Sequence, residues 1–252
     1  MTTTPVFLVD PELLAAVAAG DAVTVHGDEA HHARTVRRLA VGAAVELVDG
    51  AGRRARGLVA AGADRALTVT VSAVVVDPEP TPRITVVQAI AKGDRSEQAV
   101  EMLTEVGVDA IVPWAAERSI AVWRGDKRVR GVRRWESVAR AAAKQSRRSR
   151  VPHIAEPADT AAVAELLATA RRGLVLHEAA TEPLATIAVL DSGDLILVVG
   201  PEGGISPVEL ARFESVGARA VRLGDSVLRT STAGVVAAAV VLARCGRWSG
   251  VV

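Results

Sequence analysis

The stretch LILVVGPEGGISPVEL, Leu195 to Leu210, decides the fold class of this chain. An apolar run ends in a glycine-rich turn, and Ser206, Pro207 and Glu209 then occupy the N-cap, first and third positions of a helix. This pattern is a capping box, so the start of the helix is well determined. A strand that passes through a tight loop into a helix is typical of an open α/β sheet, which binds its ligands at the carboxyl ends of its strands.

The same alternation extends on both sides of this stretch. Near-continuous apolar strands separated by helices predict a parallel sheet that is covered on both faces. We expect strands at 83–90, 109–114, 173–178, 195–200 and 218–224, and helices at 95–106, 127–145, 160–170, 207–216 and 232–245. Asp94 is the expected cap of the first of these helices, and Thr230 or Ser231 that of the last.

The first third of the chain has a different pattern, with short strands expected at 6–9, 22–27, 44–50, 55–60 and 66–76. The letters DGAG, at 49–52, are a hairpin signal, and one helix is expected from Asp28 as N-cap to Ala40, so this part predicts a small barrel. The segment DPEPTPR, Asp77 to Arg83, holds three prolines that disfavour both helix and sheet pairing. We therefore divide the chain into a barrel domain at 1–76, a linker at 77–83 and an α/β domain at 84–252.

Composition sets further limits. The chain has 252 residues, half of them hydrophobic, with two Phe, four Trp and no Tyr, so its cores must consist mainly of Ala, Val and Leu. Cys245 is the single cysteine, which excludes an intramolecular disulfide and fits a reducing compartment. The N-terminus lacks a signal-peptide pattern, and the longest apolar run, Ala233 to Ala243, is too short to span a bilayer. We therefore expect a cytoplasmic protein that does not bind a membrane. We also expect no metal site, because His31 and His32 lie on different helix faces and no further ligand completes a site.

The loop GPEGG looks at first like a phosphate cradle. Pro201 has no N–H to donate, Glu202 would repel a phosphate, and the spacing fits neither the Walker pattern nor GxGxxG. Two interpretations remain, a plain tight turn and a loop that cups a neutral or cationic ligand, and we favour the second.

The segment LGDSVLRTSTAG, Leu223 to Gly234, also follows a strand and precedes a helix. Two such loops at neighbouring strand ends would form the walls of one pocket. Arg229 lies between apolar residues and the helix start, where it either makes a structural ion pair or faces a ligand.

Positive charge is concentrated in two places although the formal net charge is only +1. The run from Arg118 to Arg150 holds twelve Lys and Arg residues against Asp126 and Glu136, and Arg34, Arg37 and Arg38 form a second cluster. An ordinary solvated helix face would carry charges of both signs, whereas this excess of positive charge would bind a phosphate backbone. We therefore favour RNA or DNA as partner over a basic surface without a partner. Few aromatic residues are present for base stacking, so this contact should be mostly electrostatic. Lys92 and Arg95 lie at a helix mouth where they would touch substrate.

Several of these stretches occur together in one known family. KGDRSEQAVEMLTEVGV, PWAAERS, AAKQSRRSRVP, VVGPEGGISPVEL and LGDSVLRTSTA stand in the order found in the ribosomal RNA small-subunit methyltransferase E family, and HHARTVRRLAVG extends the resemblance into the barrel. The chain resembles these SPOUT-class enzymes over nearly its whole length. The resemblance implies a PUA-like barrel followed by an α/β domain with a trefoil knot, and a homodimer that uses S-adenosylmethionine to methylate N3 of a uridine in 16S rRNA of the 30S subunit.

The resemblance also implies roles for particular residues. The donor-binding loops correspond to Leu176, His177, Glu178, Val199, Gly200, Pro201, Glu202, Gly203, Gly204, Leu223, Gly224, Ser226, Val227, Leu228 and Thr230. Arg229 would stabilise the charge that develops on the base. The expected RNA contacts are Arg34, Arg37, Arg38, Lys92, Arg95, Arg118, Arg147, Arg148 and Arg150.

One position departs from the family pattern. Many members carry an acidic residue directly after the RT of the last motif, whereas this chain has Ser231, so a base role for that carboxylate does not transfer. Three other functions stay open from sequence: a SPOUT enzyme acting on another RNA atom such as a ribose 2′-hydroxyl, a non-catalytic RNA-binding assembly protein, and a nucleotide-dependent enzyme that binds ATP through the glycine loop.

Overall fold

The computed structural model describes residues 4–61, 66–188 and 190–249. The chain forms two compact units, an N-terminal unit made of Met1–Glu79 and Ala143–Val151, and a C-terminal unit made of Pro80–Ala142 and Pro152–Val252. The first division therefore falls within the expected linker at 77–83. The return of Ala143–Val151 to the N-terminal unit has no counterpart in the contiguous division made from sequence.

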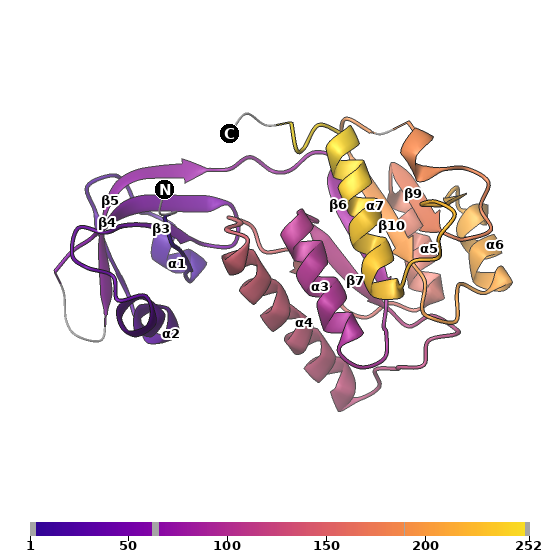
Figure 1. Ribbon diagram of the computed structural model, residues 1–252, viewed down its shortest axis with the longest axis horizontal. Coiled ribbons are helices and arrows are strands. Elements are labelled where there is room, and N and C mark those ends of the chain that lie inside the picture. The colour runs from indigo at the N-terminus through magenta and orange to yellow at the C-terminus, as the bar shows by residue number, and fades with distance from the viewer. Residues whose placement is uncertain (1–3, 62–65, 189, 250–252) are drawn as a thin grey trace. The chain divides into compact units, whose positions relative to one another are not determined.

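The N-terminal unit is built on a five-stranded sheet in the order β1-β3-β4-β5-β2. Its strands β3, β4 and β5 are labelled in Figure 1. β1 pairs with β3 in parallel, and the other pairs are antiparallel. The expected hairpin at 49–52 joins β3 to β4. Phe7, Leu14, Leu47 and Leu67 fill its core. Its elements are β1 (Val6–Leu8), α1 (Pro11–Leu14), β2 (Ala22–Val25), α2 (Gly27–His31), η1 (His32–Val36), β3 (Ala44–Val48), β4 (Arg53–Val59) and β5 (Leu67–Val76).

The helix expected from Asp28 to Ala40 is shorter than predicted and begins earlier. His26 stands at the N-cap position, so the assignment of Asp28 as N-cap was wrong. A π-helical turn, η1, continues α2 as far as Val36, and Arg38 then adopts a left-handed backbone with φ of 50°. The N–H of Leu39 donates to the carbonyl of Ala33, which closes the helix as a C-terminal cap does.

The C-terminal unit contains a six-stranded, fully parallel sheet in the order β11-β9-β10-β6-β7-β8. The near-continuous apolar strands predicted this parallel sheet, because strands that are buried on both faces carry apolar side chains throughout. The elements are β6 (Arg83–Ala89), α3 (Arg95–Val106), β7 (Ala110–Trp114), α4 (Asp126–Gln145, whose last residues fall in the N-terminal unit), β8 (His153–Ile154), α5 (Thr160–Thr169), β9 (Arg172–Leu176), η2 (Leu184–Thr186), β10 (Asp194–Val199), α6 (Pro207–Ser215), β11 (Arg219–Val221) and α7 (Thr230–Arg244).

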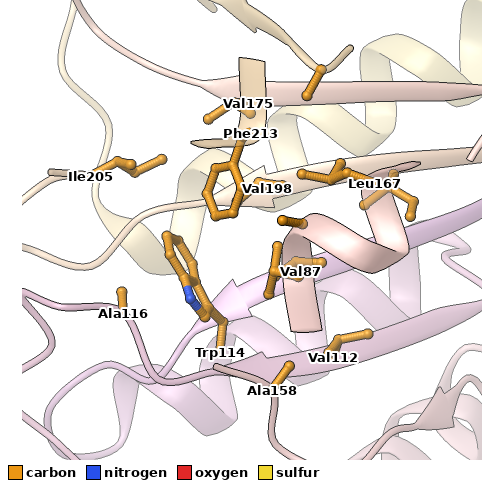
Figure 2. Packing of buried hydrophobic residues seen from close by; sticks show 14 of the residues in the cluster. Val87, Val112, Trp114, Ala116, Ala158, Leu167, Val175, Val198, Ile205 and Phe213 are labelled. Atoms are coloured by element: carbon orange, nitrogen blue, oxygen red, sulfur yellow. The ribbon is translucent and has the colours of Figure 1, made fainter. Parts of the chain in front are cut away.

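Helices cover both faces of this sheet. On one face Val87 and Val198 pack into a cluster with residues of α5 and α6, where the rings of Trp114 and Phe213 meet edge to face at 5.4 Å (Figure 2). Successive strand residues point to opposite faces. Gln88 and Val199 accordingly face Gly234 of α7 on the other side, where they take up the space that a side chain at Gly234 would need.

Three local expectations for this unit need correction. α7 begins at Thr230, so neither Thr230 nor Ser231 caps it, and Arg229 occupies the N-cap position without a side-chain capping bond. Asp94 holds the N-cap position of α3 but makes no side-chain cap. β11 ends at Val221 because Arg222 pairs its backbone with residues 182 and 184 instead. The short elements β8 and η2 of this unit and α1 of the N-terminal unit were not predicted, since each has too few residues to show a hydrophobic period.

Candidate functional site

A cavity of about 740 Å³ lies at the carboxyl ends of three neighbouring strands, β9, β10 and β11. The chain segments that follow these strands form its wall, as expected for ligand sites of open α/β sheets. All the residues predicted to bind the methyl donor line it, and so does Arg229. The structure therefore brings together three separate segments of the sequence, within 176–178, 199–205 and 221–233.

The conformation of the glycine loop has a local cause. Ser206 and Glu209 form the predicted capping box, in which the Glu209 N–H donates to the Ser206 hydroxyl at 3.2 Å and the Ser206 N–H donates to Glu209 Oε2 at 3.0 Å. The buried Glu209 carboxylate also accepts a hydrogen bond from the N–H of Glu117 and one from the hydroxyl of Thr160. One carboxylate thus fixes the loop to the segment after β7 and to α5.

Gly203 is needed because another segment lies directly on it. A Cβ at this position would lie 3.0 Å from the Cβ of Arg118 and 3.2 Å from its carbonyl oxygen. The Arg118 guanidinium in turn donates to the carbonyl of Gly203 at 3.2 Å. Arg118, predicted as an RNA contact, therefore holds the glycine loop in this structure.

Glu202 braces the loop from its other side. Its carboxylate accepts a hydrogen bond from the N–H of Lys92 at 3.4 Å and lies 3.8 Å from the Arg95 guanidinium. The same residue lines the cavity. The sequence left open whether Glu202 braces the loop or faces the ligand space, and the geometry permits both.

Arg229 stands at the junction between the last loop and α7, with its side chain exposed and part of the cavity wall. Among the residues that the structure describes, no carboxylate forms an ion pair with it. The interpretation of Arg229 as a structural ion pair is therefore not supported. A neighbouring pair, Arg222 with Asp225 at 3.2 Å, bridges the same loop.

The cavity has lining residues that sequence reasoning missed, namely Arg95 as a wall residue, Ile205, Val221, Arg222, Asp225 and Ala233. All of these except Arg95 lie within a few residues of a predicted donor contact, so their place in the wall could have been predicted from their neighbours. Arg95 also lines a second groove of about 730 Å³ together with Lys92, Asp94, Glu97 and Glu101. Arg95 thus lines both the cavity and the second groove, which its position in the sequence does not indicate.

The remaining basic residues divide into exposed and engaged side chains. Arg37, Arg38 and Arg147 are exposed on the N-terminal unit, and Arg34 is partly exposed there. Arg150 pairs with Glu79 at 2.9 Å, donates to the carbonyl of Asp77 and keeps only 21% of its side chain exposed. Its guanidinium is therefore used within the unit.

Two absences concern the described part of the chain. Within residues 4–61, 66–188 and 190–249, no three or more His, Cys, Asp or Glu side chains are grouped so that they would hold a metal ion. In that same part, none of the helices combines the length and the apolar character needed to cross a membrane.

The family follows from comparison with known proteins. Residues 77–242 match the model of the RNA methyltransferase domain, and residues 25–72 match that of the RNA methyltransferase PUA domain. Ribosomal RNA small subunit methyltransferase E of Mycobacterium bovis is 46% identical over 91% of this chain and 89% of its own length. The chain belongs to the ribosomal RNA small subunit methyltransferase E family.

Solved structures of this family share the fold. Ribosomal RNA small subunit methyltransferase E of Neisseria gonorrhoeae, bound to S-adenosyl methionine, superposes with a TM-score of 0.82 at 26% identity, covering 96% of this chain and 98% of that one. A Legionella pneumophila protein in complex with the bound cofactor SAM gives a TM-score of 0.83 at 25% identity with the same coverage. The PUA-like and α/β architecture expected of a ribosomal RNA small subunit methyltransferase E is thereby confirmed.

Proposed function

We propose that this protein transfers a methyl group from S-adenosylmethionine to N3 of a uridine in 16S rRNA. The observation that carries the proposal is the cavity, whose wall contains every residue predicted to bind the donor. Two structural relatives with the same fold bear S-adenosylmethionine in their structures.

The cavity fits this donor in size and charge. Its volume of about 740 Å³ lies within the range of pockets for small molecules and cofactors. Glu178, Glu202 and Asp225 line it and offer carboxylates to a cationic sulfonium, and the arginines Arg95, Arg222 and Arg229 balance their charge. S-adenosylmethionine supplies an electrophilic methyl group when it is bound there. The glycine-rich backbone lets the loop approach a ligand closely.

The residues around the cavity have separable tasks in this proposal. Glu209 and Arg118 hold the glycine loop, and Glu202 fixes it to the Lys92 segment, so the reactants meet in a constant geometry. The N3–H proton of the uridine passes to solvent, N3 then bonds to the methyl carbon, and the bond from that carbon to sulfur breaks with its electron pair on sulfur, which leaves as the neutral S-adenosylhomocysteine. The negative charge of the deprotonated base spreads over its carbonyl oxygens, where the Arg229 guanidinium stabilises it. Ser231, 4% exposed within α7, supplies no carboxylate to take the proton.

The substrate part of the proposal rests on the family and on charge. Arg34, Arg37, Arg38 and Arg147 of the N-terminal unit, with Lys92 and Arg95 beside the second groove, are the proposed phosphate contacts. Arg148 remains a predicted contact. Because ribosomal RNA in the small subunit is the proposed substrate, we place the reaction in the cytoplasm. The trefoil knot and the homodimer are further parts of this proposal, and light scattering of the purified protein tests the dimer.

Titration calorimetry tests the donor site directly. We expect S-adenosylmethionine to bind at one site per chain, and ATP to leave that binding unchanged because the loop offers no phosphate cradle. Competition by ATP would favour a nucleotide-dependent enzyme. An absence of donor binding would favour a non-catalytic RNA-binding protein.

A further inference from the structure

Gln88 is a polar side chain buried behind the wall of the cavity. It lies near the carboxyl end of β6, a strand at the centre of the sheet, and pairs in register with Val199, a residue of the cavity wall. Its exposed fraction is 1%. A buried amide is unfavourable unless its hydrogen-bonding groups are satisfied, so its presence here needs an explanation.

The amide of Gln88 reaches the first turn of α7. Its Nε2 donates to the carbonyl of Thr230 and to that of Ala89, both at 3.3 Å. Thr230 is the first residue of α7. Arg229, directly before it, occupies the N-cap position, but its side chain makes no capping hydrogen bond to the helix. The bond from Gln88 therefore ties the start of α7 to the central strand beside the proposed catalytic arginine.

Two features that lower the stability of the fold lie side by side at the contact between Gln88 and α7. Gln88 Oε1 is buried without a hydrogen-bond partner among the described residues. Gly234 lies in the interior of α7, where glycine is less favourable than alanine. A Cβ on Gly234 would lie 3.1 Å from Gln88 Oε1 and 3.2 Å from Val199, so the glycine makes room for the amide. Sequence features that oppose stability and coincide beside a site indicate a functional constraint.

We propose that Gln88 is a positioning residue, which fixes Thr230 and through it the Arg229 backbone against the sheet. The proposal rests on the proposed methyl transfer. It gives Gln88 no contact with the donor, so the amide acts on turnover and leaves donor affinity nearly unchanged.

Gln88→Met tests the proposal because methionine keeps the length of the side chain and removes both hydrogen-bonding groups. We expect kcat for RNA methylation to fall about three- to tenfold, the effect of one hydrogen bond, with the Kd for S-adenosylmethionine within twofold of the wild-type value. The melting temperature should not fall by more than a few degrees, since the unpaired Oε1 is removed as well. Gln145→Met, an exposed glutamine at the end of α4, is the matched control and should retain the wild-type kcat.

A double-mutant cycle shows whether Gln88 acts through Arg229. In the Arg229→Ala background, Gln88→Met should lower kcat no further. A wild-type kcat for Gln88→Met, or a loss that adds fully to that of Arg229→Ala, would overturn the proposal.

Gly234→Ala gives a second readout if Gln88→Met fails to fold. The added methyl group presses on the amide, so kcat should fall although alanine favours the helix. Unchanged turnover in that variant would contradict the role of Gln88. If the wild-type protein itself methylates no RNA, the proposed function fails, which is a different outcome from failure of the variants.

Discussion

Arg229 is the residue on which the proposed chemistry depends most. Arg229→Ala should lower kcat by about a hundredfold or more, as the loss of one preorganised charge-stabilising donor does, while donor affinity changes little. Arg229→Lys keeps the charge without the planar fork and should recover only part of the rate. Single-turnover methylation at saturating donor and RNA measures both. Equal turnover of Arg229→Ala and wild type would remove this residue from the mechanism.

Arg38 and Arg147 place a charged side chain where the backbone favours glycine. Their φ angles are 50° and 59°, in the left-handed region, and both follow a helix end. Such a backbone costs a non-glycine residue about 1 kcal/mol, so these arginines do not serve stability, and we propose that they serve RNA contact. Arg38→Gly and Arg147→Gly should therefore each stabilise the protein by up to about 1 kcal/mol. Each should also weaken RNA binding and reduce, by about one, the slope of the logarithm of the RNA affinity against the logarithm of the salt concentration.

Arg37→Gly is the control for this pair of effects, because Arg37 is exposed but has an ordinary helical φ of −82°. It should weaken RNA binding without stabilising the fold. Thermal melts and RNA titrations at several salt concentrations measure both quantities. A loss of stability in Arg38→Gly, with RNA affinity unchanged, would show that the arginine is structural.

The β3–β4 hairpin carries a buried carboxylate, Glu46, whose charge makes the stability of the fold depend on pH. Glu46, 7% exposed, accepts hydrogen bonds from Arg54 and Arg56. Burial opposes ionisation of Glu46, but the hydrogen bonds and charges of the two arginines outweigh it and lower its pKa below the ordinary 4.5. The folded unit is thus stabilised above the unfolded pKa, and this stabilisation is lost as the pH falls through the folded value.

Glu46→Gln should therefore destabilise the protein at pH 7, by about 2 kcal/mol, and flatten the fall of stability below pH 5. Urea unfolding at a series of pH values checks both effects. Parallel pH profiles of variant and wild type would show that another group causes the acid sensitivity.

Local signals explain which elements the sequence predicts well. The capping box at Ser206 fixed the start of α6, and apolar runs fixed the parallel strands, because both depend on neighbouring residues. The start of α7 was predicted two residues too late, and the hydrogen bond from Gln88 to Thr230 at this start joins residues that are 142 positions apart in the chain. The contact of Arg118 with Gly203 escaped prediction, since 85 residues separate the two in the chain.

The cavity at the ends of β9, β10 and β11 lies within the C-terminal unit, and the exposed arginines Arg37, Arg38 and Arg147 lie in the N-terminal unit. The family resemblance predicted this division of a PUA-like unit from a methyltransferase unit, and the family models match both parts. What no local pattern indicated is that Ala143–Val151 belongs to the N-terminal unit, because its composition continues that of the basic helix before it.

We propose that this chain methylates N3 of a uridine in 16S rRNA. The most direct measurement is to incubate the protein with labelled S-adenosylmethionine and either 30S particles or naked 16S rRNA, and then to map the modified nucleotide by mass spectrometry. We predict a single labelled uridine whose methyl group is on N3. A methyl group on a ribose 2′-hydroxyl, or no label in either RNA, would contradict this proposed activity.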